Sequence, residues 1–259
     1  AGSIEVTNEN NLTINVIGTN SISSGTSSAL KSKAGGIPGP TITFVKAGDG
    51  DCSLELSSTG VTVISTQFGG LNYTNLALVT DVEGDVSYDY QFSGLSYYDS
   101  QSQSTLPITS ALITSYTTYG ITVGGVAVTS LNASNITGDN IVAYQDGDYS
   151  VTYDAESNTL SLANARVASG GISSTSNAAL NVSLNGSVVL GSSTVNGISC
   201  AGDLSISAVG TNIIFYPVVS TKDGEATLTL QNGSDADSKL TLNYQGSECG
   251  FAAVVYDIS

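Results

Sequence analysis

The sequence lacks histidine, tryptophan and methionine entirely, and its 6 basic residues are outnumbered by 22 acidic ones. Without histidine, neither a Ser-His-Asp nor a Cys-His catalytic site can be built. A formal net charge of −16 leaves no basic track for the phosphates of a nucleic acid, and it disfavours an anionic membrane surface in the same way. We therefore exclude nucleic acid as a partner and histidine-dependent catalysis as a function.

Long apolar runs and abundant cysteine are also missing. No stretch of 18 or more apolar residues could insert into a membrane as a helix. The 3 cysteines are odd in number, so at most one disulfide can form within the chain, and their spacing fits no zinc site. We interpret Cys52, Cys200 and Cys249 as small buried residues, and a Cys200–Cys249 bridge stays open as an alternative.

Short runs that alternate apolar and polar residues follow one another along the whole chain, for example at residues 12–16, 41–45, 180–184 and 204–208. Most of these runs end at Gly, Asn, Asp or Ser, as short strands between turns do. The 29 glycines supply the positive-φ positions that such turns need. The pattern predicts an all-β protein.

The chain also repeats itself, because residues 12–22 are similar to residues 180–190 and a strand-like run follows each copy. Such similarity implies tandem structural units. A strand spacing of roughly 10 to 12 residues fits a β-sandwich or a β-solenoid. The small and β-branched residues favour the solenoid, whose interior is narrow. A β-sandwich, which fills a gap of about 10 Å with larger side chains, stays as the alternative.

The stretch after residue 98 is rich in Ser, Thr and Gln and contains Pro107. We place a connection there, at residues 101–118. It separates a first β-solenoid unit at residues 1–100, which is a truncated copy of the repeat, from a second unit at residues 119–259.

The second unit resembles a known module. Residues 119–133 read Tyr-Gly-Ile-Thr-Val-Gly-Gly-Val-Ala-Val-Thr-Ser-Leu-Asn-Ala, and residues 149–165 read Tyr-Ser-Val-Thr-Tyr-Asp-Ala-Glu-Ser-Asn-Thr-Leu-Ser-Leu-Ala-Asn-Ala. This pattern is similar to a β-helical, carbohydrate-binding-type repeat module of large secreted surface proteins from gut-type Clostridia and Bacteroidetes. The resemblance covers residues 119–210, and residues 1–65 match only its rung-like part. It implies a right-handed parallel β-helix that binds carbohydrate.

A secreted or bacterial cell-surface location follows from the same resemblance. The chain opens with Ala1-Gly2-Ser3, which suits the end left by signal-peptide cleavage and suits a trimmed chain equally well.

Tyrosines are the candidate glycan-binding residues, since their rings are amphipathic and frequent at binding surfaces. Two groups stand near amide and carboxylate residues: Tyr88, Tyr90, Tyr97 and Tyr98, and then Tyr144 and Tyr149, with Tyr153 beside them. Packing at the edge of the core is the alternative role for these rings. The absence of tryptophan argues against a binder of crystalline polysaccharide.

Carboxylates gather in turns that could supply the oxygen ligands of calcium. The candidates are Asp81, Glu83 and Asp85 in one turn, and Asp146 and Asp148 in another. Neither turn matches an EF-hand or a nonapeptide calcium repeat, so ordinary solvated turns are the alternative. No cofactor is required, and calcium is the one metal that the sequence suggests.

Enzymatic activity is the least favoured class. A polysaccharide lyase needs basic groups near its substrate, yet Arg166 is the only arginine and the lysines are scattered. We therefore predict a non-catalytic surface or secreted module for adhesion or glycan binding, with a glycan or a host or cell-surface ligand as its partner. A structural stalk or self-assembling filament subunit is the first alternative, and a polysaccharide lyase or hydrolase on a β-helix is the second.

Overall fold

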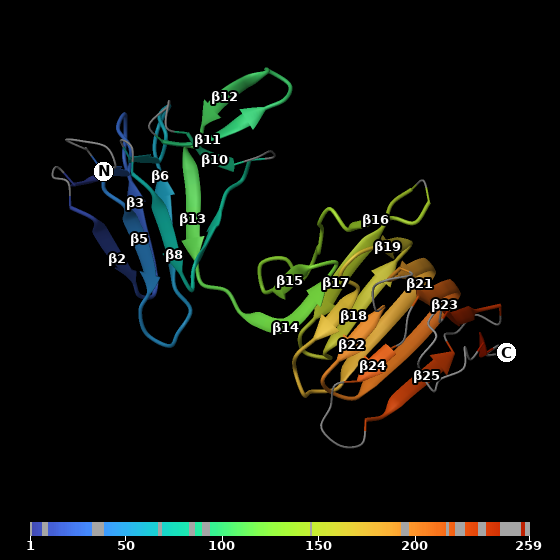
Figure 1. Cartoon of the computed structure of the whole chain (residues 1–259). Helices are drawn as coiled ribbons and strands as arrows, with labels where there is room; N and C mark the ends of the chain where they lie inside the picture. Colours follow the sequence, from blue (N-terminus) through green and yellow to red (C-terminus); the bar gives the residue numbers. More distant parts are fainter. Residues whose placement is uncertain are drawn as a thin grey trace. The chain divides into compact units, whose positions relative to one another are not determined.

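The computed structural model describes residues 2–6, 10–32, 39–66, 69–82, 86–89, 94–145, 147–192, 197–215, 218–220, 226–232, 237–243 and 255–256. In these ranges the chain forms strands and no helix, so the all-β prediction is confirmed. The strands build a β-solenoid of about 8 turns, as predicted, and not a sandwich. Two compact units, Ala1–Tyr116 and Thr117–Ser259, make up the chain (Figure 1).

Across the described ranges, no helix is long and apolar enough to span a membrane.

Unit 1 begins as a stack of parallel coils with three faces. The faces are the ladders β1–β4–β7, β2–β5–β8 and β3–β6, and every pairing within them is parallel. The strands are β1 (Ile4–Val6), β2 (Leu12–Val16), β3 (Thr19–Ser23), β4 (Leu30–Ser32), β5 (Ile42–Lys46), β6 (Ser53–Ser57), β7 (Ile64–Thr66) and β8 (Leu71–Thr74).

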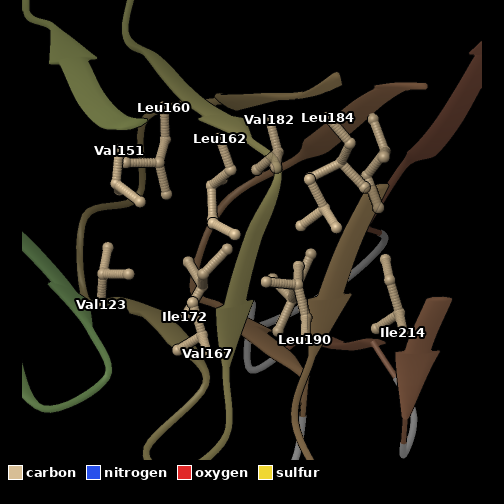
Figure 2. Packing of buried hydrophobic residues seen from close by; sticks show 14 of the residues in the cluster. Val123, Val151, Leu160, Leu162, Val167, Ile172, Val182, Leu184, Leu190 and Ile214 are labelled. Carbon is tan, nitrogen blue, oxygen red and sulfur yellow. The ribbon is translucent and has the colours of Figure 1, made fainter. Parts of the chain in front are cut away.

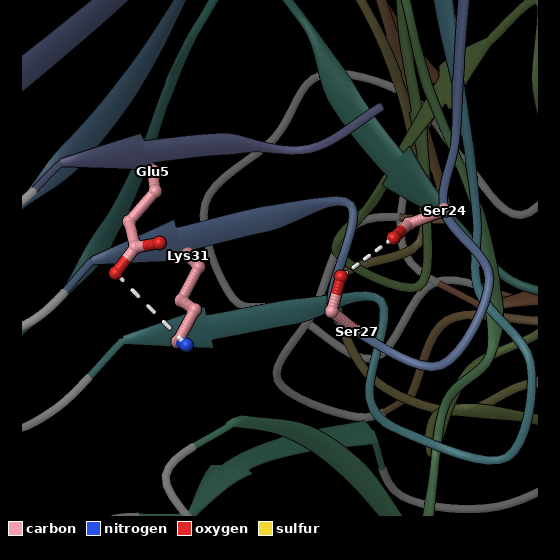
Figure 3. Close-up of polar contacts among 4 residues, drawn as sticks. All are labelled: Glu5, Ser24, Ser27 and Lys31. Carbon is pink, nitrogen blue, oxygen red and sulfur yellow. Dashed lines mark hydrogen bonds and ion pairs between the residues drawn. The ribbon is translucent and has the colours of Figure 1, made fainter. Parts of the chain in front are cut away.

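Polar side chains also make contacts on the outside of these coils. Glu5 on β1 and Lys31 on β4 form an exposed ion pair at 4.0 Å, and the Ser24 and Ser27 hydroxyls lie 2.8 Å apart at the corner between β3 and β4 (Figure 3). An exposed pair of this kind contributes at most about 1 kcal/mol. The coils are therefore held by backbone ladders and by the core.

Antiparallel strands end unit 1. β13 (Ser110–Thr114) lies between β6 and β9 (Ala77–Val79) and runs antiparallel to both. Between β9 and β13 the chain forms an antiparallel meander of β10 (Val86–Asp89), β11 (Gly94–Asp99) and β12 (Ser104–Pro107). Residues 101–118, expected to form a connection, thus include β12 and β13.

Antiparallel strands also begin unit 2. The first coil consists of β18 (Thr159–Ala163), β19 (Ala165–Val167) and β20 (Ile172–Ser174). Each of these strands pairs with an antiparallel partner: β17 (Ser150–Asp154) with β18, β16 (Ile141–Ala143) with β19, and β14 (Thr118–Val123) with β20. β15 (Val126–Thr129) forms a hairpin with β14. Residues 118–154 therefore cap this end of the coil stack.

The rest of unit 2 is a parallel stack, except that β27 pairs antiparallel with β26. β21 (Leu180–Leu190) pairs with β18 and β19 on one side and with β23 (Leu204–Phe215) on the other. β23 pairs onward with β25 (Leu228–Asn232) and β26 (Lys239–Asn243), and β26 meets β27 (Val255–Tyr256). β20, β22 (Ile198–Cys200) and β24 (Val218–Ser220) form a further face.

Each unit has its own core. The core is built from every second residue along the strands, the one that points inward. In unit 2 the parallel register stacks Leu160, Val182 and Ile206 in one column, and Figure 2 shows the first two of them side by side. All three are buried, and burial of such a side chain contributes about 1.5–3 kcal/mol. Cys52 and Cys200 are buried free thiols, as interpreted from the sequence, and Cys249 lies outside the described residues.

Glycine and asparagine make the bend between two faces of unit 2. Asn164, Gly186 and Gly210 all have positive φ, at 50°, 74° and 82°. A Cβ on Gly210 would lie 2.3 Å from the carbonyl oxygen of Gly186, so the coils can approach only if this position is glycine. The Oδ1 of Asn164 accepts a hydrogen bond from Ser187 N at 3.2 Å.

A buried asparagine completes the same bend. The Oδ1 of Asn212 accepts a hydrogen bond from Val188 N at 3.2 Å, and its Nδ2 donates to Val209 O at 3.0 Å. Its side chain is fully buried. A buried backbone N–H or C=O without a partner destabilises the fold. The Asn212 side chain supplies partners for two such groups at the bend, Val188 N and Val209 O.

Candidate functional site

The predicted tyrosines of unit 1 do not share one surface. Tyr97 and Tyr98 are neighbours on β11, so their side chains point to opposite sides of the sheet. Tyr97 packs against the core of unit 1, whereas Tyr98 is 52% exposed. Tyr88 lies on β10, where only its backbone is described, and Tyr90 lies outside the described residues.

The predicted tyrosines of unit 2 divide in the same way. Tyr149 packs against the core, and its hydroxyl donates a hydrogen bond to Ile141 O at 3.1 Å. Tyr144, which follows β16, is 38% exposed. Within the described residues, each predicted group therefore contributes one ring with a substantial free surface, Tyr98 and Tyr144.

A pair of rings, of which the sequence argument had grouped only Tyr153 with the glycan-binding candidates, supports the start of unit 2. Tyr119 and Tyr153 lie with ring centroids 4.8 Å apart at a tilt of 49°, and the Tyr153 hydroxyl bonds to Asn158 Oδ1 at 2.6 Å. Both rings pack against the core. Each tyrosine lies at an inward position of a strand in which apolar and polar residues alternate, and this alternation was the sequence signal for a structural role.

The acidic turns are only partly described. Asp81 and Asp148 are exposed, and Glu83, Asp85 and Asp146 lie outside the described residues. In the part of the chain that the structure covers, no three Asp, Glu, Cys or His side chains come together to hold a metal ion. Calcium binding by these turns stays a prediction.

Two other aspartates organise similar hairpin turns, one in each unit. Asp99 accepts hydrogen bonds from the Ser102 hydroxyl and from the backbone of Gln101. Asp154 accepts them from the Ser157 hydroxyl and from the backbone of Glu156. In each turn these hydrogen bonds hold the pKa of the aspartate below its ordinary value, and the bond from the serine hydroxyl has the largest effect.

The pH dependence of these turns follows from the direction of the shift. Because the folded-state pKa of Asp154 is lowered, its stabilising bonds are present above the unfolded-state pKa and are lost as the pH falls through the folded-state pKa. We expect Ser157→Ala to raise the pKa of Asp154 while leaving that of Asp99 unchanged, and Ser102→Ala to do the reverse. An NMR titration of the carboxyl carbons measures both; an unmoved Asp154 in Ser157→Ala would contradict the assignment.

The outer side of the longest ladder in unit 2 carries uncharged polar side chains in two columns. The register of β18, β21, β23 and β25 aligns them coil by coil, about 4.8 Å apart. We call this surface the hydroxyl-amide face; its columns are Thr159, Asn181, Ser205 and Thr229, and Ser161, Ser183, Ser207 and Gln231.

Most side chains on the hydroxyl-amide face have no hydrogen-bonding partner among the described residues. Asn181 donates to Ser157 O at 2.9 Å, and Thr159 receives a bond from the Ser157 hydroxyl. The other six side chains make no hydrogen bond within the described part of the chain. The face is thus an aligned array of donors and acceptors without a charged group.

These features define a β-solenoid protein of two units, one of which carries the uncharged hydroxyl-amide face on its outer side. No family model, no curated protein and no solved structure matches the chain.

Proposed function

We propose that this chain is a non-catalytic module, secreted or displayed at a bacterial cell surface, that binds glycans through the hydroxyl-amide face. The observation that carries the proposal is the pair of aligned columns on β18, β21, β23 and β25. Serine, threonine, asparagine and glutamine both donate and accept hydrogen bonds, as sugar hydroxyls do. The paired backbones hold these side chains in register before a ligand binds, and such preorganisation lowers the cost of binding.

The charge of the protein favours neutral glycans. With a net charge of −16, the chain repels polyuronates and other acidic polymers. The columns themselves contain no acidic or basic residue. A neutral, extended polysaccharide meets no such repulsion, and its hydroxyls can pair with several coils at once.

The exposed tyrosines support the same role. Tyr98 and Tyr144 present a ring to solvent, and an aromatic face can stack on a sugar ring. A host or cell-surface glycoconjugate is accordingly the proposed partner, and binding to it would give adhesion.

The lack of histidine and the scatter of the few basic residues support a non-catalytic role, and the two carboxylates with shifted pKa values do not point to catalysis. A glycoside hydrolase needs a carboxylic acid whose pKa is raised. The pKa values of Asp99 and Asp154 are shifted in the opposite direction, by hydrogen bonds that shape turns. These two groups suit structure better than proton transfer.

A glycan array followed by calorimetry tests the proposal. We expect saturable binding to neutral glycans, and a loss of at least about tenfold in affinity, or about 1.4 kcal/mol, when Ser183 and Ser207 are both replaced by lysine. The matched control is Thr13→Lys with Thr43→Lys, an aligned outward pair in unit 1 that should leave affinity unchanged. The absence of binding by the unmodified chain across the array, or equal losses in both variants, would reject the proposal.

Calcium is examined in the same experiment. Repeating the array with excess calcium and with a chelator shows whether glycan binding depends on calcium or not. Identical binding means that no calcium is required, and a gain with calcium assigns a role to the acidic turns.

A further inference from the structure

The hydroxyl-amide face is longer across the strands than along them. Its two columns run over four coils, which are about 4.8 Å apart, whereas the columns lie only two residues from each other along each strand. The next outward position is occupied by Ala163, Asn185 and Val209, which do not share one chemistry. The bend at Gly186 and Gly210 follows directly. The uniform polar array therefore has its long axis across the strands.

The strand register keeps the two columns straight from one coil to the next. β21 and β23 pair without a shift along their whole length, from Leu180 with Leu204 to Leu190 with Ile214. The pairing of β18 with β21, and of β23 with β25, is unshifted as well. All eight side chains of the columns are partly or fully exposed, so each column is a straight row open to solvent. A ligand that uses the whole array has to be straight over the length of four coils.

The linkage of a polysaccharide decides whether it can follow such a row. Pyranose units joined through equatorial bonds form an extended ribbon, in which each sugar advances by a length close to the spacing of the coils. An axial bond turns the chain into a helix, which leaves a straight row after one or two sugars. In the extended ribbon successive sugars are turned over, so both edges carry hydroxyls. Each coil meets these two edges with a pair of donor and acceptor side chains, for example Asn181 with Ser183 and Ser205 with Ser207.

We infer that the hydroxyl-amide face takes an extended, equatorially linked neutral glycan that lies across the strands, with one sugar residue on each coil. This inference rests on the proposed glycan binding and adds to it the direction of the bound chain, its linkage and the spacing of its subsites. The first sugar to bind bears the loss of translational and rotational freedom, and each further sugar on the same chain adds contacts without repeating that loss. Affinity is therefore expected to rise with chain length.

The four coils do not contribute equally to this site. The Thr159 hydroxyl on β18 receives a hydrogen bond from Ser157, and Asn181 on β21 donates to Ser157 O at 2.9 Å. Thr229 and Gln231 on β25 are exposed and make no hydrogen bond among the described residues. A group that already has a partner within the protein gains less from a ligand than one that exchanges only water. The sugar on β25 is therefore expected to contribute more than the sugar on β18.

Calorimetry with soluble oligosaccharides tests the linkage and the length. Cellotetraose has equatorial bonds between its glucose units, and maltotetraose contains the same sugar with an axial bond at each link. We expect cellotetraose to bind at least about tenfold more tightly than cellobiose, and at least about tenfold more tightly than maltotetraose. Equal affinities for the two tetrasaccharides, or for cellobiose and cellotetraose, would overturn the inference.

Backbone amide shifts in NMR spectra, recorded during a titration with cellotetraose, test the direction of the bound chain. A glycan that lies across the strands is expected to shift residues of β18, β21, β23 and β25 together. A glycan that lies along a strand would shift one strand and its immediate neighbours, and this result would overturn the inference while leaving the proposed function intact. The absence of saturable binding to every neutral glycan on the array would instead reject the proposed function and the inference with it.

Thr229→Val tests the contribution of a single coil, because it removes one hydroxyl and nearly keeps the shape of the side chain. We expect the affinity for cellotetraose to fall by about two- to tenfold, the usual effect of one hydrogen bond. Thr241→Val is the matched control: Thr241 lies between the core residues Leu240 and Leu242 on β26, and so points outward on another face of the same coil. This variant should bind like the unmodified chain, and equal losses in both variants would contradict the assigned subsite.

Discussion

Gly210→Ala is expected to destabilise unit 2 by about 3–5 kcal/mol, because the new methyl group would meet a backbone oxygen. The Cβ would lie 2.3 Å from Gly186 O and 3.0 Å from Gly186 C. A neighbouring coil cannot move away from such a contact without breaking the ladder between β21 and β23. The positive φ of 82° adds strain of about 1–3 kcal/mol for any residue other than glycine.

Gly125→Ala is the matched control for this prediction. Gly125 has a φ of 86°, close to that of Gly210, but a Cβ there would meet nothing within 4 Å. It is expected to cost only the backbone strain, about 1–3 kcal/mol. Urea denaturation followed by far-UV circular dichroism measures both values. Equal losses of stability would show that backbone strain, and not the close approach of coils, makes glycine necessary at position 210.

Phe44→Ala should lower the free energy of unfolding of unit 1 by about 3–5 kcal/mol, the usual cost of deleting a buried aromatic ring. Phe44 is fully buried and stacks on Tyr73, with ring centroids 5.6 Å apart and planes 8° apart. Phe44→Leu retains most of the volume and is expected to cost clearly less. Hydrogen exchange resolved by peptide should show the loss in unit 1 and not in unit 2, since the two cores are separate.

The pKa of Tyr73 reports on the cavity that Phe44→Ala would leave beside its ring. Burial raises the pKa of Tyr73 to about 12, and its hydroxyl is buried. Because this pKa is raised in the folded state, the buried neutral hydroxyl of Tyr73 favours the folded state fully below the ordinary pKa of about 10. This contribution to stability is lost as the pH rises through about 12. We expect Phe44→Ala to lower the pKa of Tyr73, measured by tyrosinate absorbance. An unchanged value would mean that the neighbouring coils close over the cavity.

The sequence did not identify the hydroxyl-amide face. Ser183 and Ser207 are 24 positions apart, and nothing local shows that they lie on one column. The tyrosine groups were visible as clusters, yet alternation along β11 sends Tyr97 to the core and leaves Tyr98 outside. Whether a residue is displayed depends on the phase of its strand, and a shift of one position reverses that phase.

The sequence by itself determined that the chain is all-β, that its coils repeat, and that its charge repels anionic partners. Those properties follow from alternation, turn residues and composition, which are local or additive. Only the tertiary structure decided that β13 enters antiparallel between β6 and β9, that residues 118–154 cap unit 2, and that Asn212 lies buried at a bend. These features depend on which distant backbone groups pair, because each strand can satisfy its hydrogen bonds with several partners and the packing of the whole core selects among them.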